Sequence, residues 1–234
     1  MLKIPTCCKT IDESLSGGIP SNSVSLVYGE PETGKTTLAL QCTVNCARQG
    51  YKTLFVDCDG KFSPRRLSQI ASEEYEQIAE LIILMKLNDF REQTIIMDRM
   101  TDYVTKSFGL IVFDTITSLY RLRIAETPSK TFELNRELNR QLAVLAQIAK
   151  TQRIAVLITS QVHSVLDETP ISIEPVATRV LKFWADIVLA LRPTRKPSVI
   201  SMTLEKNPRK LASRTCDFRI EEAGMHELSV RGRS

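Results

Sequence analysis

Short apolar runs alternate with helical patterns along most of the chain. The runs are rich in Val, Ile, Leu and Phe and end at polar residues, which predicts buried β-strands. They cover residues 24–28, 53–57, 81–87, 109–114 and 154–159. Apolar residues at helical spacing, or long stretches without Pro or Gly, predict helices over residues 35–48, 72–80, 90–106 and 131–151. This alternation is typical of an α/β fold with a mostly parallel central sheet flanked by helices.

Two of the predicted helices carry an apolar face that should point into the core. In the long helix over 131–151, Arg136 and Arg140 fall on the outer side. Its buried stripe is predicted to be Leu134, Leu138, Leu142, Leu145 and Ile148. In the amphipathic helix expected over 90–106, the inward residues are predicted to be Ile95, Ile96, Met100 and Val104.

The last third of the chain follows a different pattern. Strand patterns at 186–191, 198–205 and 216–221 alternate with turns, which predicts antiparallel hairpins that close the sheet. Residues 225–234 are expected to form a flexible tail. Only 28 residues precede Gly29, too few for a separate amino-terminal domain, so we expect a single domain over residues 1–234. Residues 10–20 read as a short helical turn, ended by two glycines and a proline, that leads into the strand at 24–28.

Composition sets broad limits on the function. An apolar fraction of 43% and a charged fraction of 25% are ordinary for a water-soluble protein. The net charge of +4 permits contact with nucleic acid or an acidic partner without demonstrating either. No signal peptide or apolar run long enough to span a membrane stands out, so a cytoplasmic location is expected.

The six cysteines are scattered along the chain. Only Cys42 and Cys46 lie close together on a predicted helix, and four metal ligands are not in place. We therefore expect reduced core thiols and no metal site built on cysteine.

The segment Gly29 to Thr36 matches the phosphate-binding loop G-x-x-x-x-G-K-[ST] at every fixed position. A strand precedes it and a helix follows it, as this motif requires. The glycines let backbone N–H groups and the helix amino terminus converge on phosphate, while Lys35 would reach the β- and γ-phosphates. The hydroxyl of Thr36 would bind Mg²⁺. The candidate ATP-binding residues are Gly29, Glu30, Pro31, Glu32, Thr33, Gly34, Lys35, Thr36 and Thr37.

Polar residues end three of the other predicted strands, at the edge where α/β sheets bind ligands. Asp57 and Asp59 are both candidates for activating water, and their alternative role is ordinary turn chemistry. Asp114 ends an apolar strand in the form of a Walker B segment, whose carboxylate holds the Mg²⁺ shell. Gln161 could hydrogen-bond a γ-phosphate or its attacking water, or could be a polar strand cap.

Two basic regions are candidates for nucleic-acid contact. A probable loop over 117–130 carries Arg121 and Arg123 beside an aromatic residue, which suits phosphate contact and base stacking. From residue 179 to residue 219, ten Lys or Arg face three acids, a balance of +7. A solvated surface is an equal alternative for both regions. Residues 162–178 read as a mobile, acidic loop, which would repel a phosphate backbone.

Five segments together resemble the RecA-like recombinase family of archaea and eukaryotes. They are residues 15–20, 29–36, 56–66, 109–114 and 160–162, and the resemblance covers nearly the whole chain. It implies a RecA-like P-loop ATPase core that binds ATP, Mg²⁺ and single- or double-stranded DNA. It assigns phosphate and Mg²⁺ binding to Lys35 and Thr36, the Walker B role to Asp114 and γ-phosphate sensing to Gln161.

The resemblance also implies weak catalysis. Asp59 falls where these recombinases carry a glutamate that activates water, and aspartate is one methylene shorter. A misplacement of about 1 Å can cost about 10²-fold in rate, so slow turnover is expected. The segment 206–209 resembles one that caps the ATP of a neighbouring subunit in filaments of this family, which leaves a homo-oligomer open. The residues expected to contact DNA are Arg121, Arg123, Lys206, Arg209 and Lys210.

Two departures from the family pattern favour an accessory role. The sequence contains no Phe-x-x-Ala, the motif that links recombinase subunits, and the loop over 162–178 lacks glycines. We therefore expect a protein of DNA repair and recombination that assists the main, RadA-type recombinase without efficient strand exchange. Two alternatives stay open. One is a KaiC-like regulatory ATPase that acts on protein partners, and the other is a module that holds ATP as a structural ligand.

Overall fold

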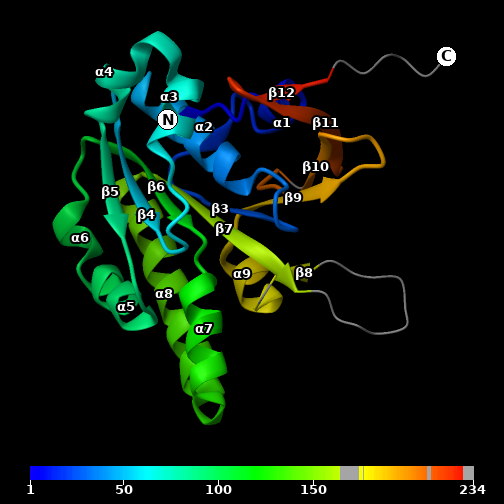
Figure 1. Ribbon diagram of the computed structural model, residues 1–234. Helices are drawn as coiled ribbons and strands as arrows, with labels where there is room; N and C mark the ends of the chain where they lie inside the picture. Colours follow the sequence, from blue (N-terminus) through cyan, green and yellow to red (C-terminus); the bar gives the residue numbers. More distant parts are fainter. Residues whose placement is uncertain (164–173, 176, 210–211, 229–234) are drawn as a thin grey trace.

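A ten-stranded sheet forms the centre of the protein (Figure 1). The computed structural model describes residues 1–163, 174–175, 177–209 and 212–228. Neighbouring strands run parallel in the order β9-β3-β7-β6-β4-β5. Their bounds are β3 (Val24–Gly29), β4 (Lys52–Asp57), β5 (Ile82–Lys86), β6 (Phe108–Asp114), β7 (Ala155–His163) and β9 (Ile187–Pro193). The predicted α/β fold with a mostly parallel sheet is confirmed.

Antiparallel strands extend the sheet beyond β9, as predicted. They are β10 (Val199–Lys206), β11 (Arg214–Glu221) and β12 (Gly224–Glu227). Part of the expected flexible tail is wrong, because residues 225–227 belong to β12 and pair with β11. Two short pairs complete the strands: β1 (Lys3–Ile4) with β2 (Ile19–Pro20), and β8 (Glu174–Pro175) with β7.

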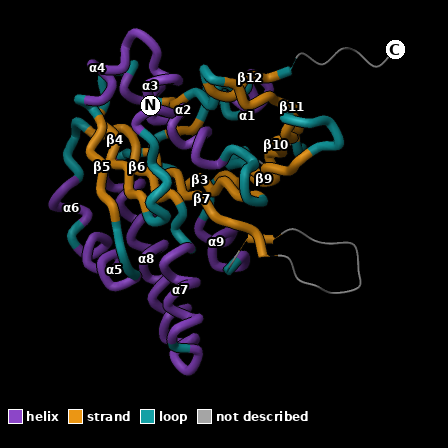
Figure 2. The backbone as a smooth tube through the Cα atoms, in the orientation of Figure 1, coloured by secondary structure: helices purple, strands orange, loops and turns teal. Residues whose placement is uncertain are grey.

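Helices cover both faces of the sheet (Figure 2). Side chains alternate along each strand, so that Val27 faces one apolar layer while Leu26 and Tyr28 face the other. The first layer contains α1 (Lys9–Ser14), α2 (Lys35–Ala47), α3 (Pro64–Ala71), α4 (Tyr75–Ala79) and the antiparallel strands. The second contains α5 (Phe90–Asp98), α6 (Met100–Tyr103), α7 (Ser118–Glu126), α8 (Thr131–Gln152) and α9 (Thr178–Trp184).

The long helix α8 buries the predicted stripe, with Leu134 only partly covered. Three other details differ from the sequence prediction. The helix expected over 90–106 breaks at Arg99 into α5 and α6, and Ile95 is 45% exposed, not inward. The probable loop over 117–130 is α7 followed by a 3₁₀ turn (Pro128–Lys130). Helix α9 forms where only loop and turn were expected.

The amino-terminal lead-in forms the predicted helical turn, α1, and ends at two glycines with positive φ. Gly18 has φ of 117°, and a Cβ there would lie 2.2 Å from the carbonyl oxygen of Ile4. The expectation of reduced core thiols is wrong for two cysteines. Cys8, at the start of α1, forms a disulfide with Cys216 on β11, and Cys7 is exposed.

The predicted acidic loop over 162–178 falls mostly outside the described residues, and its described ends belong to β7, β8 and α9 instead of a loop. Within the described ranges, no helix is long and apolar enough to cross a bilayer.

Candidate nucleotide site

The phosphate-binding loop turns between β3 and α2. Gly34 adopts the left-handed region at φ 90° just before α2 begins, a conformation that favours glycine. At Gly29 an added Cβ would lie 2.4 Å from the carbonyl oxygen of Leu191 on β9, so this position admits no side chain without movement. The hydroxyl of Thr33 donates to the carbonyl oxygen of Glu30 and closes the turn. The loop therefore presents the amino terminus of α2 to the space beyond β3.

Lys35 is folded back onto the loop itself. Its ammonium donates to the carbonyl oxygens of Gly29 at 3.0 Å and Glu30 at 2.6 Å. Burial lowers the pKa of Lys35 to about 8, although the nearby Asp114 acts in the opposite direction. A buried cation whose hydrogen bonds go to carbonyl oxygens is poised to bind an anion, and a phosphate would stabilise its charged form.

Thr36 and Asp114 meet at the bottom of the site. The Thr36 hydroxyl donates to Asp114 Oδ2 at 2.7 Å, and the Thr159 hydroxyl on β7 donates to Oδ1. Burial raises the pKa of Asp114, against the hydrogen bonds from Thr159 and Thr36, which lower it. A hydroxyl and a carboxylate are hard oxygen ligands of the kind that Mg²⁺ prefers, so these residues fit a magnesium ion.

Asp57 and Asp59, the two candidate bases, have different surroundings. The carboxylate of Asp57 accepts hydrogen bonds from the backbone N–H groups of Asp59, Lys61 and Phe62, at 3.0 to 3.2 Å, and so holds the turn after β4. Asp59 instead lines a cavity of about 530 Å³ together with Lys35, Thr36 and Gln161. Asp59 is therefore the carboxylate that faces the space where a nucleotide would lie.

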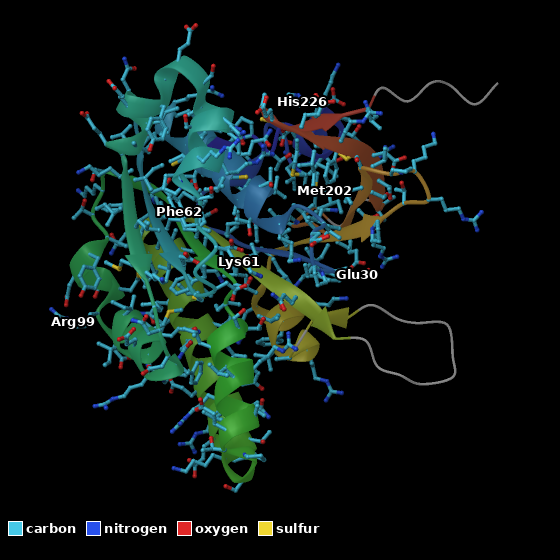
Figure 3. All side chains as sticks on the ribbon, in the orientation of Figure 1. Glu30, Lys61, Phe62, Arg99, Met202 and His226 are labelled. Atoms are coloured by element: carbon cyan, nitrogen blue, oxygen red, sulfur yellow. A yellow bond between two sulfur atoms is a disulfide. The ribbon has the colours of Figure 1, made fainter. Side chains whose placement is uncertain are left out.

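Gln161 lies between Asp59 and helix α7. Its Nε2 donates to Asp59 Oδ2 at 3.4 Å, and its Oε1 accepts from the guanidinium of Arg121 at 3.1 Å. Asp59 Oδ2 also accepts from the Thr115 hydroxyl at 3.2 Å and lies 3.4 Å from Lys61 Nζ. Figure 3 shows Lys61 near the centre of the molecule, with Glu30 of the phosphate-binding loop to its right.

Among the described residues, the candidate DNA contacts do not form one surface. Arg121 and Arg123 lie on α7, which follows the carboxyl end of β6. Lys206 pairs with Val188 near the start of β9, so it and the following Arg209 lie at the opposite, amino-terminal edge of the parallel strands. Lys206 donates to the carbonyl oxygens of Lys182 and Ala185 at the end of α9. Lys210 lies outside the described residues.

Sequence reasoning missed several residues of the site. Thr115 and Thr159 follow or end apolar strands, and their polarity beside Asp114 and Gln161 could have drawn attention to them. Ile220 carries no comparable signal, because it reaches the phosphate-binding loop from β11. A Cβ added at Gly34 would lie 2.7 Å from Ile220 Cδ1, which shows how closely β11 covers the loop.

The loop, the hydrogen-bonded Thr36–Asp114 pair and the parallel sheet define a P-loop nucleotide-binding core of the RecA-like class. A model of the Rad51 family matches residues 1–228, and the chain belongs to this family. The "DNA repair and recombination protein RadB" of Methanosphaera stadtmanae is 30% identical over 224 residues, which cover 95% of this chain and 94% of that protein.

A second relative and a solved structure show the same similarity. The protein of the same name from Methanocaldococcus jannaschii is 34% identical over 181 residues, which cover 77% of this chain and 83% of the relative. Among solved structures, "Crystal structure of the RadB recombinase" superposes with a TM-score of 0.80 at 32% identity, covering 97% of this chain and all of that one. The resemblance to archaeal RadB thus extends over nearly the whole chain.

Proposed function

We propose that this chain is an ATP- and DNA-binding protein of homologous recombination and DNA repair. It hydrolyses ATP slowly and assists a RadA-type recombinase without efficient strand exchange of its own. The observation that carries the nucleotide part is the Thr36–Asp114 pair beneath the phosphate-binding loop, with Asp59 and Gln161 in the wall of the same cavity. The names of the RadB relatives support the recombination part. The Rad51-family match favours this class over a KaiC-like regulator.

The residues that line or adjoin the cavity have different roles in phosphoryl transfer. Backbone N–H groups at the start of α2 and Lys35 hold the β- and γ-phosphates, and Lys35 gives up the carbonyl oxygens of Gly29 and Glu30 to do so. Thr36 and Asp114 would hold Mg²⁺, which would neutralise charge on the phosphates. Asp59 accepts the proton of the attacking water.

Two features of the site support slow turnover. The short side chain of Asp59 places its carboxylate about one methylene farther from the phosphates than a glutamate would. In addition, Thr115, Gln161 and Lys61 all approach Oδ2 of Asp59, so a water that approaches this oxygen competes with three protein partners.

Steady-state hydrolysis and nucleotide binding together test this assignment. Asp59→Ala should lower the rate at saturating Mg-ATP by at least about tenfold, while its Kd for ATP stays within about threefold of wild type. Asp217→Ala, which removes an exposed acid on β11, is the matched control and should leave both values unchanged. An Asp59→Ala protein that hydrolyses ATP at the wild-type rate would overturn the catalytic role and support ATP as a structural ligand.

A further inference from the structure

Cys8 and Cys216 lie beside a carboxylate. One carboxylate oxygen of Glu227 and the sulfur atoms of the two cysteines all lie within 4.8 Å of one another. Both cysteines are buried, and Glu227 is partly exposed. Two sulfurs and one carboxylate oxygen are a donor set that Zn²⁺ accepts, at about 2.3 Å from sulfur and about 2.0–2.2 Å from oxygen. The cluster therefore has the chemistry of a metal site as well as that of a disulfide.

The backbone spacing of the two cysteines suits an ion between their sulfurs. The Cα atoms of Cys8 and Cys216 are 7.5 Å apart, whereas the Cα atoms of disulfide-bonded cysteines are usually about 4.4–6.8 Å apart. Two thiolates on one tetrahedral Zn²⁺ keep their sulfurs about 3.8 Å apart, which is farther than a disulfide bond allows. The wide Cα spacing is therefore compatible with a metal-bound pair once the bond is reduced.

Thr10 fixes the orientation of the Glu227 carboxylate. The backbone N–H of Thr10 donates to Oε2 at 3.1 Å, and the Thr10 hydroxyl donates to Oε1. Each carboxylate oxygen has two lone pairs, so it can bind a cation while it accepts one of these hydrogen bonds. Hydrogen bonds of this kind orient the ligands of protein metal sites. His226 precedes Glu227 on β12, but it is exposed and belongs to the opposite face of the strand, so it is not a ligand.

The three residues come from segments that are far apart in the sequence. Cys8 precedes α1, Cys216 lies on β11, and Glu227 ends β12. Helix α1 packs against β11, and β11 pairs with β12 (Figure 1). A bond or an ion at this point therefore joins the amino-terminal lead-in to the hairpin that carries Ile220 over the phosphate-binding loop.

We propose that Cys8, Cys216 and Glu227 form a zinc site in the reduced protein, with water as the fourth ligand, and that the ion takes over the structural role of the disulfide. A cellular dithiol supplies two electrons and two protons to the Cys8–Cys216 bond and is itself oxidised to a disulfide. Zn²⁺ then binds the two sulfurs as thiolates, and both protons are released. The inference is independent of the proposed function, because it concerns neither nucleotide nor DNA.

Zinc binding by the full chain tests the site. One sample is reduced with a phosphine, which becomes its phosphine oxide, and a second sample stays oxidised. Both are dialysed against Zn²⁺ in excess Mg²⁺, which fills sites made of oxygen ligands alone. The reduced wild type should hold one Zn²⁺ per chain, and the oxidised wild type none. Co²⁺ in place of Zn²⁺ should give the reduced protein the sulfur-to-metal charge-transfer absorption of a thiolate site.

Two pairs of variants locate the ion. Glu227→Gln keeps the size of the side chain and removes its charge, so it should raise the Kd of the reduced protein for Zn²⁺ by at least about tenfold. Asp217→Asn removes the same charge from an exposed acid beside Cys216, and should leave that Kd within about threefold of wild type. Cys8→Ser should abolish the cobalt absorption, whereas Cys7→Ser, which removes the exposed neighbouring thiol, should not change it.

Thermal unfolding measures the structural role of the ion. A ligand present at about 100 times its Kd should raise the Tm of a chain of this size by about 5–10 °C. We expect Zn²⁺ to raise the Tm of the reduced wild type by this amount and to leave the Tm of the oxidised protein unchanged. At the same zinc concentration, reduced Glu227→Gln should gain no more than about half of that increase. This variant keeps both cysteines, so its oxidised form shows whether the substitution itself harms folding.

Four results would overturn the inference. If the reduced wild type holds no Zn²⁺, the site does not exist. Equal binding by the oxidised and reduced protein would place the ion elsewhere on the chain. A Kd for Zn²⁺ that Glu227→Gln does not change would remove the carboxylate from the site. Zn²⁺ that binds the reduced chain without raising its Tm would contradict the structural role given to the ion.

Discussion

Gln41 joins the carboxyl-terminal hairpin to the helix that follows the phosphate-binding loop. This residue of α2 is 4% exposed, and its carboxamide forms two hydrogen bonds with the backbone of Met225 on β12. Nε2 donates to the Met225 carbonyl at 3.1 Å, and Oε1 accepts from the Met225 N–H at 2.8 Å. The side chain thus forms the hydrogen bonds with the Met225 N–H and C=O groups that a neighbouring strand would otherwise form. It also helps to hold β11 and Ile220 over the loop.

Gln41→Leu keeps the size of the side chain and removes both hydrogen bonds. Two buried backbone groups then lose their hydrogen-bond partner, and each destabilises the folded chain by about 1–3 kcal/mol. Burial of the leucine side chain offsets about 1 kcal/mol of this loss. We expect the free energy of unfolding to fall by about 3 kcal/mol. For a chain of 234 residues this corresponds to a drop in Tm of about 6–12 °C. The Kd for ATP should rise as well, because the hairpin that covers the loop becomes looser.

Urea unfolding followed by circular dichroism measures the first effect, and calorimetric titration with Mg-ATP measures the second. Gln147→Leu is the control, because Gln147 lies on the exposed side of α8. An unfolding free energy of Gln41→Leu within 1 kcal/mol of both wild type and this control would refute the role given to the Gln41–Met225 pair.

Two further predictions concern the disulfide and Lys35. The Cys8–Cys216 bond joins residues 208 apart, so chain entropy sets an upper limit of about 5 kcal/mol on its stabilisation. Reduction with dithiothreitol, or the substitution Cys216→Ser, should therefore lower Tm. A thiol count on the unreduced, denatured chain should find only Cys7, Cys42, Cys46 and Cys58 as free thiols. Six free thiols would exclude the bond. Because the pKa of Lys35 is lowered to about 8, the nucleotide-free protein loses this charge as pH rises through 8. Binding of ATP should then take up about half a proton at pH 8, which is measured as a dependence of the calorimetric heat on the buffer. The affinity for ATP should fall above pH 8 and should not change with pH well below 8. Lys35→Met should remove the proton uptake, and an unchanged uptake would contradict the assignment.

The sequence predicts those parts of the molecule that local rules determine. The phosphate-binding loop needs a strand, fixed glycines and a helix in that order, and Gly29, Lys35 and Thr36 satisfy all of these within one short segment. The buried strands are also visible, because parallel strands covered on both faces are continuous apolar runs. Asp114 ends such a strand, and Thr36 begins the helix after another, so both are expected at the carboxyl edge of the sheet.

The remaining features depend on contacts between distant segments. No local pattern connects Cys8 with Cys216, Gln41 with Met225 or Arg121 with Gln161. Helix α7 was mistaken for a loop because its hydrophobic face is short and Pro128 follows closely, although the helix ends at Glu126 before that proline. Ile95 is exposed because α5 buries the face formed by Phe90, Gln93 and Met97, and Ile95 lies on the opposite side of that helix.

The most direct test of the account is DNA binding by fluorescence anisotropy over a salt series, with and without Mg-ATP. We expect a labelled single strand to bind at low salt. Its affinity should fall steeply as salt increases, with a slope of about −0.7 in log K against log salt for each phosphate contact. Mg-ATP should change that affinity. No binding at low salt, or binding that salt does not weaken, would contradict the claim that this Rad51-family chain binds DNA through its basic surfaces.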